Sequence, residues 1–385
     1  MVETATVTWT EEGQSRQARW LSDSGAPAPR QLLMVDDSMR ADDAYSLAGQ
    51  GTGLMWRGDF HNARQLLTAL ASRIERHARR SARRAGAPAA AAESFHRHRQ
   101  VQAQRARTLG ALLIPLEADY TIPLRRAPDA RQACLEAFGP GAGQALMSLR
   151  ALLGVIGAHQ WRVKGIEVPA AGGRIHPHYG VFAPIRAEYV ELVASAPLPA
   201  PGTAFDIGTG TGVLAAVLAR RGIGQVVATD LDPRALACAR ENFARLGITA
   251  AVELAQADLF PPGRAQLIVC NPPWLPARPS SPLERGIYDP DSQMLRGFLE
   301  GLGAHLAPGG EGWLVLSDLA ERLELRTRAQ LLDMIAGAGL EVIERSETKP
   351  SHRKSADVHD PLHRARAAEV TSLWRLRAAG TAGEQ

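Results

Sequence analysis

The feature that most constrains the fold of this chain is the regular alternation of strand-like and helix-like segments after residue 203. Short apolar runs typical of buried strands occupy residues 204–207, 225–229, 251–254, 267–270, 312–316, 341–345 and 370–376. Helical spacing of apolar residues fills most of the intervals, at 213–221, 234–246, 293–306 and 327–338. This alternation predicts an α/β fold with a doubly wound, mostly parallel sheet of seven strands and helices on both faces. Ligands of such sheets bind at the carboxyl ends of the strands.

The N-terminal part follows a different pattern, and we expect it to form a separate α+β domain. Polar and apolar residues alternate on both sides of Glu11-Glu12-Gly13, which predicts a β-hairpin or two edge strands. Asp59 is a candidate N-cap for a helix from Phe60 to about Arg84. The change of pattern predicts two domains, residues 1–150 and residues 151–385.

Less regular segments connect these two parts. Residues 131–160 carry leucines at helical spacing and are predicted to be helical, with a break at 139–141. Residues 161–165 are expected to form a strand and a turn. A helix is expected over residues 185–194, just before the alternating region.

Residues 73–107 are unusually rich in positive charge, with a glycine and proline break near residues 86–88. The arginines are Arg76, Arg79, Arg80, Arg83, Arg84, Arg97, Arg99, Arg105 and Arg107. Such a stretch can follow the phosphate backbone of a nucleic acid. It is equally typical of a solvated helix face in a chain that uses arginine almost everywhere in place of lysine. Both interpretations stay open from the sequence.

Composition narrows the class of protein. The net charge is +4, and we find no apolar stretch long enough to span a membrane and no signal-peptide pattern.

The cysteines Cys134, Cys238 and Cys270 have no paired spacing, which argues against a disulfide framework or a zinc ribbon. A basic loop is expected between the last strands, and no metal site, because no standard spacing is matched by His352, His359 and His363 with Asp357 and Asp360. The expected location is the reducing cytoplasm. The oligomeric state is left open.

A glycine-rich turn follows the first strand of the alternating region, in the sequence Asp206-Ile207-Gly208-Thr209-Gly210-Thr211-Gly212. Glycines allow a ligand to lie against the backbone, and the following helix directs its N–H groups toward that place. The spacing is G-x-G-x-G and differs from the G-x-G-x-x-G of dinucleotide binding. The turn therefore indicates a cofactor without identifying it.

Acidic residues follow the next two strands. Asp230 lies about 20 residues beyond the glycines in the sequence. In nucleotide-binding folds an acidic residue at this spacing accepts hydrogen bonds from ribose hydroxyls. Asp258 and Leu259 follow the third strand, where a carboxylate and an apolar neighbour can bind an adenine amine and its ring. Up to this point a nicotinamide enzyme and a methyltransferase both fit.

The fourth strand separates these two alternatives because it runs into Asn271-Pro272-Pro273-Trp274. The two prolines fix the backbone and remove two donors, so their neighbouring carbonyls are free to accept. The Asn271 oxygen and the Pro272 carbonyl can together take two hydrogen bonds from one planar NH2 group. Trp274 offers a flat face for stacking. Such a site holds an amide or aromatic amine nitrogen in line with an electrophilic methyl, which is chemistry governed by positioning.

These four motifs, in this order, resemble those of the class I S-adenosylmethionine-dependent methyltransferases. The similarity is greatest to the group that contains the release-factor glutamine N5-methyltransferases and the small-domain RNA base methyltransferases, and it covers roughly residues 165–385. Residues 180–184 resemble the segment that helps to close over the cofactor. Trp274 stands where this group often has Tyr or Phe. The resemblance implies a Rossmann-like fold whose seventh strand, residues 370–376, is antiparallel at the sheet edge.

The resemblance also implies roles for individual residues, with S-adenosyl-L-methionine as the cofactor. Its binding residues would be Asp206, Gly208, Gly210, Gly212, Asp230, Asp258, Leu259 and Asn271. The transfer site would be Asn271, Pro272, Pro273 and Trp274. The expected activity is methylation of an amide or exocyclic amino nitrogen. Three acceptors remain open: a nucleic-acid base, a protein glutamine, and a small metabolite that would make the N-terminal domain a lid or dimerisation unit.

Overall fold

The computed structural model describes residues 5–22, 24–85, 90–281, 283–350 and 360–380. The expected break at residues 86–88 and the candidate ligands His352 and His359 lie outside the described residues. The chain forms two compact units, one of residues 1–89 and 93–160 and one of residues 90–92 and 161–385. The boundary expected near residue 150 falls inside helix α5 (Leu149–Lys164).

The N-terminal unit is built on a mixed six-stranded sheet with the order β1-β2-β6-β5-β4-β3. Its strands are β1 (Thr6–Glu11), β2 (Gln14–Leu21), β3 (Gln31–Val35), β4 (Thr52–Trp56), β5 (Leu112–Leu116) and β6 (Ala145–Ser148). β1 and β2 form the predicted antiparallel hairpin, in which Glu11 pairs with Gln14. β3, β4 and β5 run parallel to one another, and β6 lies between β2 and β5. This mixed sheet agrees with the predicted α+β domain.

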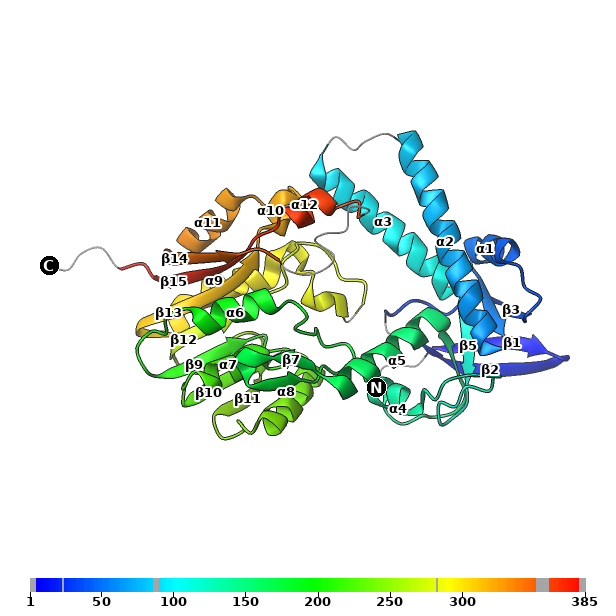
Figure 1. Cartoon of the computed structure of the whole chain (residues 1–385), viewed down its shortest axis with the longest axis horizontal. Helices are drawn as coiled ribbons and strands as arrows, with labels where there is room; N and C mark the ends of the chain where they lie inside the picture. Colours follow the sequence, from blue (N-terminus) through cyan, green and yellow to red (C-terminus); the bar gives the residue numbers. More distant parts are fainter. Residues whose placement is uncertain (1–4, 23, 86–89, 282, 351–359, 381–385) are drawn as a thin grey trace. The chain divides into compact units, whose positions relative to one another are not determined.

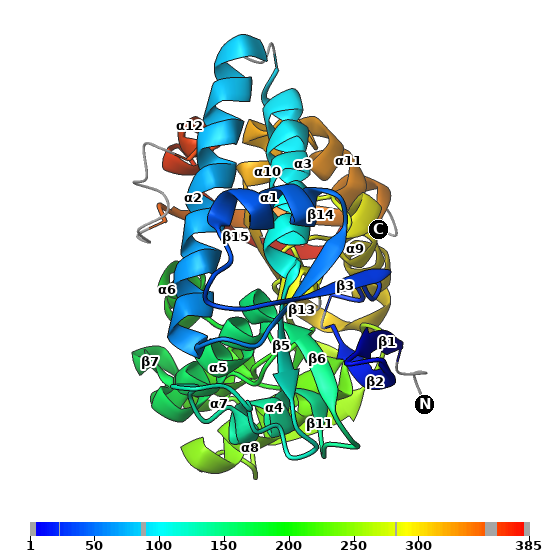
Figure 2. The same cartoon turned by 90° about the vertical axis from the view of Figure 1, so that its right-hand side faces the viewer.

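Helices α1 (Ala41–Gly49), α2 (Phe60–Ala85), α3 (Ala91–Gly110) and α4 (Arg131–Phe138) accompany this sheet together with α5. The predicted N-cap of α2 is confirmed, because Asp59 Oδ1 accepts a hydrogen bond of 2.8 Å from the His61 backbone N–H. α2 and α3 lie side by side (Figures 1 and 2), and Arg105 of α3 is bonded to Glu75 of α2 at 2.6 Å.

Two predictions near the end of this unit are wrong. β6 lies within the stretch that was expected to be helical, and three of its residues, Ala145 to Met147, are buried between neighbouring strands. A short buried apolar run has no periodicity that separates a strand from a helix, which explains the error. Residues 161–164 continue α5 and do not form a strand. The helix ends where Gly165 adopts a positive φ of 68°.

The C-terminal unit contains a seven-stranded sheet with the order β11-β10-β9-β12-β13-β15-β14. Its strands are β9 (Thr203–Ile207), β10 (Gln225–Asp230), β11 (Val252–Gln256), β12 (Ala265–Cys270), β13 (Leu306–Ser317), β14 (Leu340–Thr348) and β15 (Thr371–Ala378). The first five strands in this order pair in parallel, whereas β15 is antiparallel to both neighbours. The doubly wound α/β fold is therefore confirmed.

The last strand is antiparallel as expected, but its predicted position at the sheet edge is wrong. β15 lies between β13 and β14, and β14 forms the edge. The burial of side chains gives the physical reason. β15 is apolar and largely buried, whereas β14 carries charged side chains such as Glu341 and Glu344 and is mostly exposed. Charged side chains on an edge strand prevent it from pairing with another sheet.

Helices cover both faces of this sheet (Figure 1). One core joins the sheet to α6 (Ala187–Ser195), α7 (Val213–Arg220) and α8 (Pro233–Leu246). The opposite core joins it to α9 (Gln293–His305) and α11 (Arg328–Gly337). The remaining elements are β7 (Ile166–Val168), η1 (Pro169–Ala171), β8 (Gly173–Ile175), η2 (Leu283–Gly286), η3 (Pro290–Ser292), α10 (Leu319–Arg322) and α12 (His363–Ala367). Within the described part of the chain, every helix is too short or too polar to cross a membrane.

Candidate active site

Three neighbouring strands of the C-terminal sheet end at one edge and bring the predicted site residues together. Ile207 at the end of β9 is paired with Thr229 of β10 on one side and with Cys270 of β12 on the other. The residues that follow these three are the glycine turn, Asp230 and Asn271. Segments far apart in the sequence are thus neighbours at the carboxyl ends of parallel strands.

The glycine turn, residues 208–212, needs glycine for conformation and for space. Gly208, Gly210 and Gly212 have positive φ angles of 70°, 56° and 82°. A Cβ atom added at Gly208 would lie 2.5 Å from Met294 Cε, and one added at Gly212 would lie 2.5 Å from Phe243 Cε1. A side chain at any of the three positions would therefore strain the backbone, and at Gly208 or Gly212 it would also clash with Met294 or Phe243.

Asp206 supports this turn from beneath. Its side chain is 1% exposed, and Oδ2 accepts hydrogen bonds from Thr209 Oγ1 at 2.6 Å and from the Ala215 N–H at 3.0 Å. Burial raises the pKa of Asp206 to about 6, although these two hydrogen bonds act in the opposite direction. The carboxylate thus joins the turn to the first turn of α7.

Asp230 at the end of β10 is also tied to the glycine turn. Its Oδ2 accepts a hydrogen bond of 2.9 Å from the Gly210 N–H, and its Oδ1 accepts one of 2.9 Å from the Asp232 N–H. Burial raises the pKa of this carboxyl, against those two hydrogen bonds. Since a carboxylate has about four acceptor positions, Asp230 keeps capacity for the hydroxyl groups of a ligand.

Asp258 and Leu259 follow β11 as expected from the sequence. Asp258 is exposed. Leu259 has a positive φ of 72°, a backbone conformation that is uncommon for residues other than glycine. The Leu259 carbonyl accepts a hydrogen bond of 2.6 Å from Thr229 Oγ1, which joins this loop to β10. Phe260 stacks on His305 of α9, with ring centroids 4.3 Å apart, so it packs onto the helix.

The NPPW corner, residues 271–274, follows β12. Pro272 is buried, and Asn271 and Trp274 are partly exposed. Trp274 Nε1 donates a hydrogen bond of 2.9 Å to Asn271 Oδ1. The preceding Cys270 is fully buried, and burial raises the pKa of its thiol well above the usual value. Cys270 is therefore a small core residue and not a nucleophile.

A cluster around Arg186 was missed in the sequence. The Arg186 guanidinium lies over the Trp274 ring, 4.5 Å from its centroid, and is paired with the buried carboxylates of Glu188 and Glu369. Glu369 lies 183 positions beyond Arg186 in the chain. Only the presence of Arg and Glu directly after the apolar segment 180–184 gave any signal of it in the sequence.

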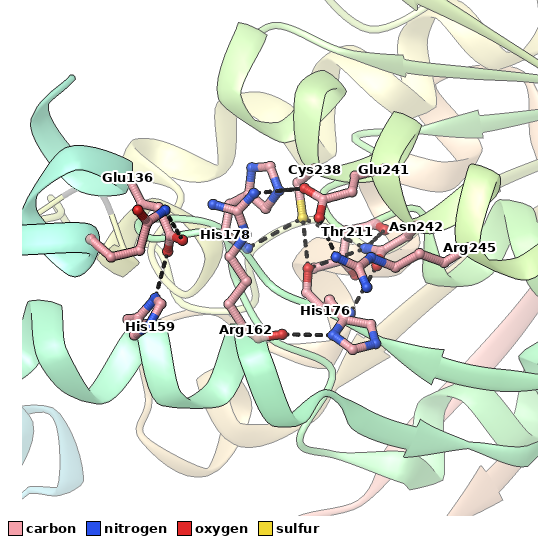
Figure 3. A network of polar contacts seen from close by, with 11 residues as sticks. Glu136, His159, Arg162, His176, His178, Thr211, Cys238, Glu241, Asn242 and Arg245 are labelled. Carbon is pink, nitrogen blue, oxygen red and sulfur yellow. Dashed lines mark hydrogen bonds and ion pairs between the residues drawn. The ribbon is translucent and has the colours of Figure 1, made fainter. Parts of the chain in front are cut away.

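The segment before α6 is anchored to α8 and to the glycine turn by a polar network (Figure 3). His178 Nε2 is bonded to Glu241 Oε2 at 2.6 Å. Burial raises the pKa of Glu241, but hydrogen bonds from Arg245, His178 and Arg162 outweigh it and lower the pKa to about 2. His176 and His178 therefore hold the backbone of this segment in place.

Asn242 makes the connection to the turn within the same network (Figure 3). Its Oδ1 accepts a hydrogen bond of 2.8 Å from the His176 N–H, and its Nδ2 donates one of 2.9 Å to the Thr211 carbonyl. The side chain is fully buried, so both bonds are protected from water.

These residues fit S-adenosylmethionine. The glycine turn carries no side chain at Gly210, where an added Cβ would meet only the Gly208 carbonyl oxygen at 4.0 Å, and Asp230 offers oxygens suited to ribose hydroxyls. Among the described residues no group of three or more His, Cys, Asp or Glu side chains is arranged to bind a metal ion.

Comparison with known proteins finds similarity to methyltransferases in this region. Residues 173–320 match the family model described as the methyltransferase small domain. The release factor glutamine methyltransferase of Cereibacter sphaeroides is 37% identical over 139 residues, which are 32% of this chain and 50% of that protein. The ribosomal protein L11 methyltransferase of Pelotomaculum thermopropionicum is 35% identical over 148 residues, which are 38% of this chain and 40% of that protein.

Among solved structures, the ribosomal protein L11 methylase from Lactobacillus delbrueckii subsp. bulgaricus aligns with a TM-score of 0.37 and 18% identity, over 53% of this chain and 85% of that chain. A similarity this low supports no functional argument. The chain spans half or less of the length of the curated relatives above. The residues that match the family model, 173–320, include the glycine turn, Asp230 and the NPPW corner.

Proposed function

We propose that this chain is an S-adenosylmethionine-dependent methyltransferase that acts on an amide or exocyclic amino nitrogen. The observation that carries this proposal is the NPPW corner at the end of β12, one strand away from the glycine turn and two strands away from Asp230. The family of residues 173–320 supports it. We assign the catalytic role to residues 151–385 and recognition of the acceptor to residues 1–150.

The cofactor supplies an electrophilic methyl group when bound. Asp230 accepts hydrogen bonds from its ribose, and the glycine turn leaves room for its methionine part. Asn271 Oδ1 and the Pro272 carbonyl each accept a hydrogen bond from an N–H of the nitrogen that is to be methylated. These bonds orient its lone pair, and the transfer is accelerated by holding the reacting atoms in line. Asp206 keeps the turn rigid through Thr209 and Ala215.

The test is transfer of labelled methyl from S-adenosylmethionine into a lysate of a strain that lacks this protein. We expect incorporation into macromolecules, and digestion with RNase or protease identifies the labelled class. A chain that binds no S-adenosylmethionine and labels no fraction would contradict the proposed activity.

We propose RNA as the acceptor on the basis of the α2 and α3 helices. Arg76, Arg79, Arg80 and Arg84 of α2 are exposed, and none of the four has an ion-pair partner among the described residues. Arg76, Arg80 and Arg84 recur every four residues and so share one face of the helix. An uncompensated row of guanidinium groups suits a polyanion.

Neutralising these four arginines to Gln tests the RNA proposal. The matched control replaces four exposed arginines that do have acidic partners, Arg16, Arg131, Arg234 and Arg377. Both variants lose four positive charges. We expect only the first to weaken RNA binding, by about tenfold or more near 0.15 M salt, and to flatten the salt dependence by roughly 0.7 for each phosphate that is no longer neutralised. Equal effects in both variants would show that only net charge matters.

A protein glutamine is the second candidate acceptor, because one relative is named a release factor glutamine methyltransferase. Label that survives RNase and is removed by protease would favour it.

The three cysteines are free and buried, which agrees with a reducing cytoplasm, and we propose that location.

A further inference from the structure

Trp274 has two defined partners, and each one restricts a different degree of freedom. Its Nε1–H donates to Asn271 Oδ1 at 2.9 Å, and its ring lies 4.5 Å from the Arg186 guanidinium carbon. The hydrogen bond fixes the ring edge, and the cation–π contact fixes the ring plane. The indole is therefore oriented by the protein and not by a ligand.

Arg186 is itself held from three sides. Its Nε donates to Glu188 Oε1 at 2.6 Å, its Nη1 to Glu369 Oε1 at 2.9 Å, and its Nη2 to Thr371 Oγ1 at 3.3 Å. The Glu188 and Glu369 side chains are only 5% and 1% exposed. Ser317 Oγ donates a further hydrogen bond to Glu369 Oε1 at 2.5 Å. Two buried carboxylates pair with one guanidinium. If Arg186 moved away, both carboxylates would be left buried without a cationic partner, so the side chain has little freedom to move.

The Trp274 hydrogen bond has a direct consequence for Asn271. It turns the amide so that the oxygen, and not the nitrogen, faces the indole N–H. A carbonyl oxygen accepts two hydrogen bonds, so one position on Oδ1 remains for the nitrogen of an acceptor. Phe has no donor, and Tyr carries its hydroxyl at the far end of the ring. Neither can reproduce this bond, so the arrangement depends on tryptophan at this position.

We propose that Arg186 is a positioning residue of the transfer site that acts through Trp274, and that the Trp274 N–H sets the orientation of the Asn271 amide. The chain of contacts runs from Glu188 and Glu369 to Arg186, then to the indole, and then to the oxygen that receives the acceptor nitrogen. This inference rests on the proposed function.

The first experiment examines the contacts without any acceptor. Full-length protein labelled with 15N-tryptophan gives an indole N–H signal for Trp274, identified by its loss in Trp274→Phe. We expect Asn271→Ala and Arg186→Lys each to shift this signal. Lys keeps the charge but lacks the planar group that stacks and bonds three partners at once. A signal unchanged in both variants would overturn the proposed chain of contacts.

The second experiment measures initial rates of methyl transfer into the lysate fraction that the wild-type chain labels, at saturating S-adenosylmethionine. We expect Arg186→Lys and Trp274→Phe each to lower kcat about tenfold with cofactor affinity within about twofold. The double variant should be no slower than the slower single variant, because both changes interrupt the same series of contacts from Arg186 through Trp274 to Asn271. Trp274→Phe keeps the question decidable if Arg186→Lys fails to fold, which thermal unfolding reports.

Arg345→Lys is the matched control. Arg345 lies 4.6 Å from the Trp374 ring centroid and donates to Ser372 Oγ at 3.2 and 3.0 Å, so this change removes a similar interaction away from Asn271. We expect its kcat to stay at the wild-type value. A wild-type kcat for Arg186→Lys, or additive effects in the double variant, would overturn the positioning role. Failure of the wild-type chain to label any fraction would instead overturn the proposed function, and this inference with it.

Discussion

The glycine turn and the NPPW corner follow neighbouring strands, yet they are stabilised in different ways. The turn is held by Asp206 and Thr209 close to it in sequence, by Asp230 some 20 residues away and by Asn242, 31 residues from Thr211. The corner is held by Arg186, and through it by Glu369, about 100 residues further along the chain. Cofactor binding should therefore tolerate distant changes better than methyl transfer does. Three substitutions examine this difference.

Asn271→Ala should have the largest effect, because it removes the oxygen that we propose to orient the reacting nitrogen. We expect transfer to fall about a thousandfold, comparable to the loss of one preorganised hydrogen bond in other active sites. Affinity for S-adenosylmethionine, measured by calorimetry, should stay within a few-fold. Retained transfer would show that the corner is not the nitrogen site, and the two regions would then lose their functional distinction.

Asp206→Asn should change the pH dependence of stability. The folded pKa of Asp206 is about 6, above its usual value near 3.8, so the folded state binds the proton more tightly. The contribution of this group to stability is then fully present below about pH 4 and is lost as the pH rises to about 6. The loss is about 3 kcal/mol for a shift of this size. Urea unfolding of the wild-type protein and of the variant between pH 4 and 7 gives the free energy of unfolding at each pH. The decrease in stability between pH 4 and 6 that comes from Asp206 should be absent in the variant.

Asp230→Ala should weaken S-adenosylmethionine binding about a hundredfold, since it removes the proposed ribose contact and a support of Gly210. The control is Asp232→Ala, two residues away, which removes the N-cap of α8 and should cost about 1 kcal/mol of stability. That control should leave cofactor affinity unchanged. Equal losses in both variants would mean that Asp230 acts on the fold and not on the ligand.

The same contrast explains how much could be predicted from the sequence. The strands and helices of the C-terminal unit were predictable, because buried parallel strands and amphipathic helices have distinct periodicities. The residues of the turn and the corner were also predictable, since each motif is continuous in sequence. Their roles in binding and transfer remain predictions. β6 was mistaken for a helix because a short buried strand lacks a period of its own.

The Arg186 cluster was not predictable for a different reason. Its members come from the start of α6, from the loop before β15 and from β15 itself, and only the folded sheet brings them together. No spacing rule connects Arg186 with Glu369. The order of β14 and β15 was missed for a related reason, since both are plausible edge strands until their burial is compared.

The position of β15 has a consequence for synthesis. A nascent chain that has passed residue 350 but has not reached residue 371 contains β13 and β14 without the strand that pairs with both. Two unpaired edges are exposed at that stage, and each is a template for association with another chain. The sheet is completed only when β15 enters between them, and the same step delivers Thr371 to Arg186. The contact between Arg186 and Thr371 can therefore form only after the last strand has been synthesised.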